Sequence, residues 1–200
     1  MEIKPIASSS KGNAYLISDF QTTVLIECGI PLKELKRKTN FIVPNVIDAC
    51  LISHEHGDHS KSLKDLLNAG VRCYALKEVF EAKEINNHHR AKRIKHLKQI
   101  DIGTFKIIPL EMNHDVPCVG FLIYSVVTNE KLLFATDTYM IKYAFHGLDY
   151  IMIEANYDIE LVEEDTQRKR LIQSHMSIDT TIQYLKSIDL SKVKRIYLMH

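Results

Sequence analysis

The chain has 200 residues, a hydrophobic fraction of 46% and a formal net charge of +1. This length suits one domain with a sizeable core, and the near-neutral charge excludes a partner recognised by bulk charge alone. The four cysteines are scattered along the chain, which is typical of reduced thiols in a protein core, so we expect a cytoplasmic protein. The N-terminus does not resemble a signal peptide, and no apolar run approaches the roughly 18 residues that span a bilayer, so we expect no membrane contact.

Alternating strands and helices are predicted through the first half of the chain. A hairpin is expected around residues 18–21, and Pro31 precedes the first helix. A helix that follows the third strand presents leucines on one face and ends at Gly70. The predicted strands are 13–18, 21–28, 48–53 and 71–75, and the predicted helices are 32–39, 59–68 and 77–85.

The second half continues with strands at about 104–111, 119–127, 131–136, 149–154 and 194–199, and with a polar helix at 159–172. Ser177 is expected to cap a further helix. That helix carries an apolar stripe formed by Ile178, Ile182, Leu185 and Ile188. Strand runs flanked by helices predict an α/β fold with two sheets and helices outside them.

The most informative segment is the hexapeptide His-Glu-His-Gly-Asp-His at 54–59, which directly follows the predicted strand 48–53. Residues two apart in an extended segment point the same way, so His54 and His56 can bind one ion. Asp58 and His59 lie past the turn and can reach a second ion. Imidazole and carboxylate are the usual ligands of zinc and its first-row neighbours, so this spacing predicts two adjacent metal sites.

This motif resembles that of the metallo-β-lactamase fold superfamily, and the resemblance extends along nearly the whole chain. The family's order continues with a His, an Asp and a terminal His, each after a later strand; His114, Asp137 and His200 follow apolar runs in that order. The resemblance implies an αββα sandwich that binds two divalent ions, zinc or manganese. The implied ligands are His54, His56 and His114 for the first metal, Asp58, His59 and His200 for the second, and Asp137 between them.

The last implied ligand, His200, is also the last residue of the sequence. In the family this His commonly begins a stretch that leads into a further helix. The single domain predicted over residues 1–200 therefore either ends naturally here or is truncated at its C-terminus.

Two further resemblances indicate a branch of the family. Residues 8–13 resemble the Ser-Gly-Asn turn of small, single-domain exonuclease-like proteins and predicted metal-dependent hydrolases, although a flexible turn explains them equally well. In that group the next strand ends in Asp-x-Gly, whereas this chain has Glu27. The resemblance implies that this carboxylate supports the metal loop, with a geometry altered by the longer side chain.

The second resemblance concerns Glu154 and His175. Residues 153–158 and 174–177 resemble segments of the same group, and the tRNA 3′-processing endonucleases (RNase Z) have a similar pair. There the His is thought to protonate the leaving oxygen while the Glu orients it. The resemblance implies the same roles here, with Asp58 and Asp137 orienting the attacking hydroxide. The alternative for His175 is a helix-capping residue.

Two basic clusters stand out in this near-neutral chain. Residues 88–98 contain a dense basic run, and Arg168, Lys169 and Arg170 form a smaller cluster. Such runs either attract a polyanion or form solvated surface. Neither is interleaved with the aromatic residues that stack on bases, so no sequence-specific recognition is implied.

The resemblance therefore implies a dinuclear metal-dependent hydrolase. A phosphodiesterase or nuclease that uses a metal-bridging hydroxide agrees best with Glu154, His175 and the basic runs. Nucleic acid or another phosphodiester would then be the substrate. Two alternatives stay open: a thioester or carboxylic-ester hydrolase like glyoxalase II, and a metal-binding regulatory protein without turnover.

Overall fold

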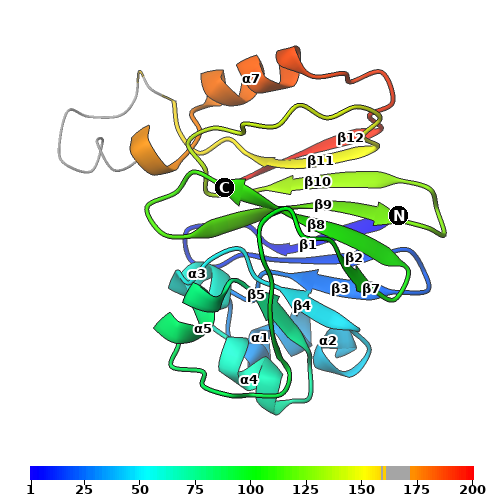
Figure 1. Ribbon diagram of the computed structural model, residues 1–200, viewed down its shortest axis with the longest axis vertical. Coiled ribbons are helices and arrows are strands. Elements are labelled where there is room, and N and C mark those ends of the chain that lie inside the picture. The colour runs from blue at the N-terminus through cyan, green and yellow to red at the C-terminus, as the bar shows by residue number, and fades with distance from the viewer. Residues whose placement is uncertain (159, 161–171) are drawn as a thin grey trace.

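Two six-stranded sheets face each other within the described part of the chain, with helices on their outer sides (Figure 1). The computed structural model describes residues 1–158, 160 and 172–200. The first sheet runs β1 (Glu2–Ala7), β2 (Ala14–Ser18), β3 (Thr23–Ile26), β4 (Ala49–Leu51), β5 (Cys73–Ala75) and β6 (Ala91–Arg93). The second runs β12 (Arg195–Met199), β11 (Tyr150–Glu154), β10 (Lys131–Ala135), β9 (Cys118–Ser125), β8 (Phe105–Met112) and β7 (Ile100–Ile102).

Helices on both outer sides complete the αββα sandwich predicted from the sequence. The helices of the first half are α1 (Leu32–Lys38), α2 (Ile42–Asn45), α3 (Gly57–Ser60), α4 (Leu63–Asn68) and α5 (Lys77–Ala82). They lie on the side of the first sheet, and α7 (Ile178–Ser187) covers the outer face of the second (Figure 1). None of the described helices is long and apolar enough to span a membrane.

The core lies between the inner faces of the two sheets. Tyr15 of β2 meets Phe134 of β10 edge to face, with ring centroids 5.6 Å apart, and Phe134 also contacts Phe121 of β9. Edge-to-face pairs are worth about 0.5–1.5 kcal/mol beyond the area that they bury. This contact joins the two sheets through buried side chains and so fixes the relative position of their strand ends.

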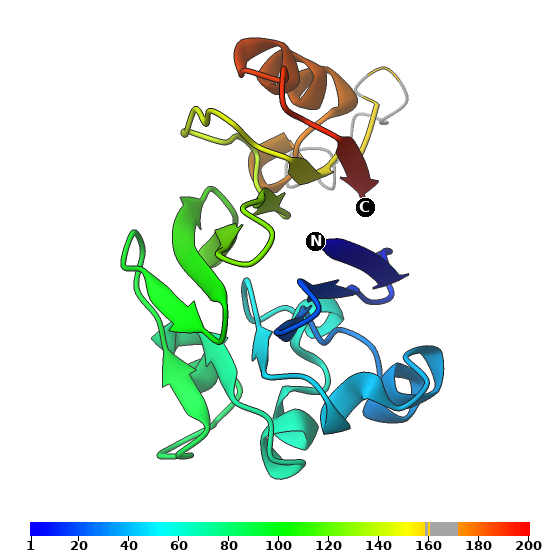
Figure 2. The same ribbon diagram turned by 90° about the vertical axis from the view of Figure 1, so that its right-hand side faces the viewer.

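The carboxyl ends of several parallel strands meet at one edge of this sandwich. Strands β3 to β6 are mutually parallel in the first sheet, as are β10 to β12 in the second. Loops that follow such strands therefore share an edge. Figure 2 shows the ends of β1 and β12 close together on one side, where the His200 N–H donates to Ser8 Oγ at 3.2 Å.

Several elements differ from the sequence prediction. Strands β1 and β6 were not predicted because both are edge strands whose side chains are exposed or only half-buried, which leaves no alternating apolar signal. Strand β7 and the short helix α2 were also missed. The predicted helix 59–68 is divided into α3 and α4. The predicted helix 159–172 lies outside the described residues, apart from residues 160 and 172.

The apolar stripe predicted for α7 is partly wrong. Ile178 and Ile182 are each 42% exposed, whereas Thr181 and Tyr184 are buried. The hydroxyls of Thr181 and Tyr184 donate to backbone carbonyls of neighbouring segments at 2.7 and 3.1 Å, so these polar-tipped side chains hold the helix on the sheet. The predicted cap is confirmed, because Ser177 Oγ accepts a first-turn N–H at 3.1 Å.

Candidate metal centre

The metal loop, residues 54–59, follows β4 at the shared edge and is hydrogen-bonded to the segments that precede β2 and follow β3. The Asn13 N–H donates to the Asp58 carbonyl and the Cys28 N–H donates to the His59 carbonyl, both at 2.8 Å. Gly29 packs so closely on the loop that an added Cβ would overlap the Asp58 carbonyl oxygen. Backbone contacts therefore fix the loop independently of its side chains.

We expect Gly29→Ala to disrupt the metal loop, because the new methyl group has no space beside the Asp58 carbonyl. Overpacking of this kind costs about 1–3 kcal/mol and displaces backbone. The matched control is Gly57→Ala, where an added Cβ would meet nothing within 4 Å. The free energy of unfolding measured in urea and the metal content should both be lower in the Gly29 variant and unchanged in the Gly57 variant. Equal values in the two variants would contradict this packing role.

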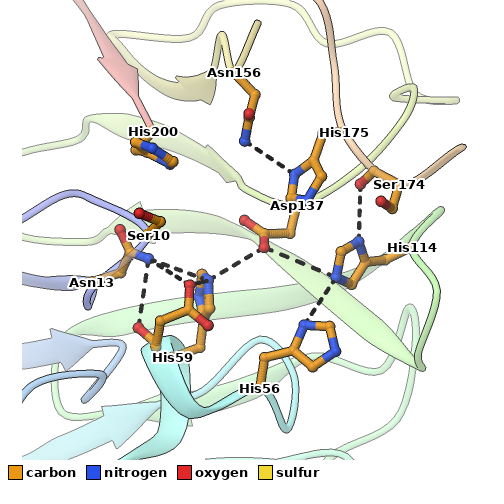
Figure 3. Close-up of a pocket in the computed structure, with 11 residues that line it drawn as sticks. Ser10, Asn13, His56, His59, His114, Asp137, Asn156, Ser174, His175 and His200 are labelled. Atoms are coloured by element: carbon orange, nitrogen blue, oxygen red, sulfur yellow. Dashed lines mark hydrogen bonds and ion pairs between the residues drawn. The ribbon is translucent and has the colours of Figure 1, made fainter. Parts of the chain in front are cut away.

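Three imidazoles and a carboxylate form the first donor group. His56 Nδ1 lies 3.0 Å from His54 Nε2. It also lies 3.3 Å from His114 Nε2 (Figure 3). Asp137 Oδ2 lies 3.6 Å from His54 Nε2 and 3.9 Å from His114 Nε2. Four tetrahedral ligands at ~2.1 Å from zinc lie about 3.4 Å from one another. The four donor atoms are therefore spaced as the ligands of a single ion.

A second donor group lies beside the first and shares Asp137 with it. His59 Nε2 is 3.2 Å from Asp58 Oδ2 and 3.3 Å from Asp137 Oδ2. The same Asp137 oxygen thus faces both groups, which is the position that a bridging carboxylate requires. The side-chain amide of Asn13 is 3.2 Å from His59 Nε2, on the far side of this second group.

Neighbouring polar atoms orient the imidazoles. Ser53 Oγ lies 2.8 Å from His54 Nδ1, and the Ser174 carbonyl lies 2.9 Å from His114 Nδ1. In each case the bonded nitrogen leaves Nε2 directed at the donor group, as is usual for metal-binding histidines. Although longer than the expected Asp, Glu27 reaches the site: Oε1 is 3.6 Å from His59 Nδ1, and Oε2 accepts the Ser53 N–H at 3.4 Å.

The electrostatics of the two groups differ. Burial, together with the neighbouring His59, holds the pKa of His54 well below its ordinary value, so its ring is neutral and can act as a ligand. Burial opposes a charge on His59, but the carboxylates of Glu27, Asp137 and Asp58 raise the pKa of His59 well above its ordinary value. Despite burial, hydrogen bonding and charge from His59 hold the pKa of Asp137 well below its usual range.

These side chains fit a divalent metal. Glu27 Oε1 and His59 Nδ1 are buried and have no other hydrogen-bond partner among the described residues, and carboxylates surround the His59 ring. Buried carboxylates need a cation or hydrogen-bond donors to offset their desolvation. Imidazole nitrogen and carboxylate oxygen suit zinc and other first-row metals, so the cluster is suited to such an ion.

The remaining predicted ligand, His200, lines the same pocket at the end of β12. Its ring lies apart from His59 in Figure 3, above Ser10. The structure therefore brings six of the seven predicted ligands into direct contact and leaves His200 at the pocket wall. Its role as a ligand stays a prediction.

The buried Glu154 and the partly exposed His175 form a pair next to the first donor group. Glu154 Oε2 lies 3.1 Å from His175 Nδ1, while Oε1 accepts the backbone N–H groups of Met176 and Thr138 at 2.7 and 2.9 Å. These bonds hold the carboxylate in place. Burial opposes a charge on His175, but Glu154 raises the pKa of the imidazole above its ordinary value. Since Ser177 supplies the helix cap, His175 is not needed for it.

A pocket of about 420 Å³ opens over this cluster. Its wall includes four polar residues to which the sequence analysis assigned no individual role: Ser10, Asn13, Asn156 and Ser174. Asn156 extends its amide to within 3.2 Å of His175 Nδ1. Asn13 and Asn156 stand in the two segments that resemble the exonuclease-like group, so the signal for them was present. Ser174 acts through its backbone carbonyl, which no sequence motif records.

A two-sheet sandwich with a His/Asp cluster at the edge where its strands end defines a metal-binding α/β protein. The chain belongs to the beta-lactamase superfamily, whose domain family matches residues 22–200. This match confirms the resemblance inferred from the hexapeptide at 54–59 and from the order of the later ligands.

Comparisons with individual proteins agree with this family assignment. The chain is 28% identical to exodeoxyribonuclease WalJ of Streptococcus pneumoniae, over 98% of this chain and 79% of that protein. Its fold is similar to that of the metallo-beta-lactamase fold protein YhfI from Bacillus subtilis, with a TM-score of 0.75 and 19% identity over 99% of this chain and 85% of that one. Human tRNase Z, short form, has a TM-score of 0.66 and 15% identity, over 100% and 92% of the two chains.

Proposed function

We propose that this protein is a metal-dependent phosphodiesterase that acts on nucleic acid, with DNA as its main substrate. The observation that carries the proposal is the shared Asp137 oxygen, which faces two donor groups, next to the Glu154–His175 pair. The named relative is a deoxyribonuclease, which agrees with the function predicted from the sequence.

Two divalent ions, zinc or manganese, are proposed to bind here. His54, His56 and His114 would hold the first, Asp58, His59 and His200 the second, and Asp137 would touch both. When bound, such a pair lowers the pKa of water and neutralises charge on a phosphate oxygen. A phosphodiester is negatively charged and would be repelled by the Asp58 and Asp137 carboxylates, so the site can bind it only when cations are also bound.

The protein's own groups would then handle the protons. Hydrogen bonding to His59 lowers the pKa of Asp58, although burial opposes this, so Asp58 stays ionised and can accept a hydrogen bond from the attacking water. His175 Nδ1 lies 3.1 Å from Glu154 Oε2, and this carboxylate raises the pKa of the imidazole and so favours the protonated ring, in which Nδ1 donates to Glu154. The ring also lines the pocket, where its Nε2–H would face the substrate. It can therefore protonate the departing oxygen, the step that a poor alkoxide leaving group needs most.

We also propose that the protein works in the cytoplasm. All four cysteines are free and buried, as the sequence analysis predicted, and unpaired thiols are typical of reducing compartments.

A substrate panel tests the proposed function. The purified protein should be assayed with added Zn²⁺ or Mn²⁺ on bis-p-nitrophenyl phosphate, single- and double-stranded DNA, RNA and a glutathione thioester. We expect metal-dependent cleavage of the phosphodiesters, with DNA preferred among the polymers. Turnover of the thioester alone would instead favour a hydrolase like glyoxalase II, and metal binding without any turnover would favour a regulatory protein.

A further inference from the structure

We propose that the basic segment, residues 88–98, is a phosphate-binding track that leads a nucleic-acid strand to the metal centre. The segment comprises the edge strand β6 and the residues on both sides of it. This inference rests on the proposed function, because it names the surface that would hold the substrate of that site.

The sheet topology places the end of the basic segment beside the site. Strand β6 is parallel to β5, and β5 to β4, so the residues after β6 lie at the same edge as the metal loop after β4. The Leu97 N–H donates to the Pro109 carbonyl at 2.8 Å. This bond ties the segment to β8, and His114 follows the end of that strand.

A hollow lies between the end of the basic segment and the metal centre. It is lined by His96 of the basic segment and by residues 111–118. His114 lines both this hollow and the pocket over the donor groups. The hollow and the pocket therefore adjoin at His114, and a strand that lies on the basic segment would reach the site by way of His96.

The cations of the segment are exposed and available. Lys92, Arg93, Lys95 and Lys98 are all exposed, and none of them forms an ion pair or side-chain hydrogen bond with another described residue. Two other exposed lysines behave differently: Lys106 pairs with Asp101, and Lys142 pairs with Glu111. Four unpaired cations along one edge, in a chain of net charge +1, concentrate positive potential at this surface.

The start of the segment adds a second hollow. The rings of His88 and His89 stack with centroids 5.1 Å apart and planes 10° apart. Together with Lys92 and Arg93 they line a pocket on β6. The track thus extends from this hollow, along the edge strand, to the hollow at His96. Contacts of this kind bind the backbone and position a strand without reading its bases.

The test removes charge from the track and, in a matched control, from another surface. The track variant is Lys92→Gln, Arg93→Gln and Lys95→Gln. The control is Lys33→Gln, Lys36→Gln and Arg37→Gln on α1, a helix on the outer side of the first sheet. It also replaces two lysines and one arginine, so both variants lose three positive charges. Binding is measured by fluorescence anisotropy, with a labelled 20-nucleotide single strand whose phosphorothioate linkages resist cleavage, over a range of salt concentrations.

We expect the track variant to bind the strand about tenfold or more weakly at low salt. The slope of log binding constant against log salt concentration should decrease in magnitude by roughly 2, because each lost phosphate contact contributes ~0.7. The control should bind like the native protein. Cleavage of bis-p-nitrophenyl phosphate should be unchanged in both variants, since this small diester does not reach the track.

The outcomes separate the track from the proposed function. Equal binding by the track and control variants, or no binding by the native protein, would overturn the track. If the strand binds through the track but no phosphodiester is cleaved, the track stands and the proposed function fails. If DNA is cleaved and the track variant cleaves and binds it normally, the proposed function stands and the track is wrong.

Discussion

Asp137→Asn is expected to remove most of the bound metal and to lower phosphodiesterase activity by about 10³-fold or more. One oxygen of Asp137 lies 3.3 Å from His59 Nε2 and 3.6 Å from His54 Nε2, so its charge serves both donor groups. The amide has nearly the same shape but no charge. Metal-ion catalysis contributes several kcal/mol, and each ~1.4 kcal/mol is a factor of ten in rate. Elemental analysis and kcat/KM on a DNA strand measure the two effects.

Single-ligand variants provide the comparison. His59→Ala and His114→Ala should each lose mainly one ion, because these residues belong to different donor groups. Asp101→Asn, which removes a carboxylate that pairs with Lys106 at the surface, should keep native metal content and activity. Full metal occupancy in the Asp137 variant would contradict its bridging position, and full occupancy in both histidine variants would contradict the ligand assignment.

His175→Ala should slow cleavage of DNA by on the order of 10²- to 10⁴-fold, the usual contribution of a general acid. The same change should have little effect on bis-p-nitrophenyl phosphate, because nitrophenolate leaves without a proton. Glu154→Gln should show a weaker form of this selectivity, since the proposed role of Glu154, which lies 3.1 Å from His175 Nδ1, is to orient the imidazole. The measurement is kcat/KM for both substrates with each variant, at native metal content.

The control for this prediction is Ser177→Ala, which removes the cap of the neighbouring helix. Loss of such a cap costs about 1 kcal/mol of stability but does not distinguish between leaving groups. If His175→Ala behaves like Ser177→Ala, with equal effects on the two substrates, then His175 has a structural role. The case for a phosphodiesterase over a thioesterase would then depend on the basic segment and the named relative.

Much of the site could be predicted because its signals are local. The hexapeptide at 54–59 follows a buried strand, and His114 and Asp137 each follow another. Buried strands produce apolar runs, and parallel strands deliver their carboxyl ends to one edge. The spacing within the loop and the positions of these strand ends are therefore visible in the sequence, and the order of the ligands identifies the family.

Other features depend on contacts between distant segments and have no local signal. The sharing of one Asp137 oxygen depends on how two sheets pack, through contacts such as Tyr15 with Phe134. The reach of Glu27 to His59 depends on its left-handed backbone, with φ at 65°, a conformation that residues other than glycine rarely adopt. The Ser174 carbonyl approaches His114 across 60 residues of chain.

The sequence by itself determined the family, the αββα sandwich and six of the side chains that converge at the metal centre, because local spacing and buried strands record them. Only the tertiary structure decided which face of α7 is buried and where the edge strands β1 and β6 lie. The spacing of apolar residues along the helix predicts which face is buried from hydrophobicity alone. Thr181 and Tyr184 are buried because their hydroxyls donate hydrogen bonds to carbonyls of distant segments. An edge strand with exposed side chains leaves no apolar pattern, so the place of the basic segment beside the site emerges only when the sheets are assembled.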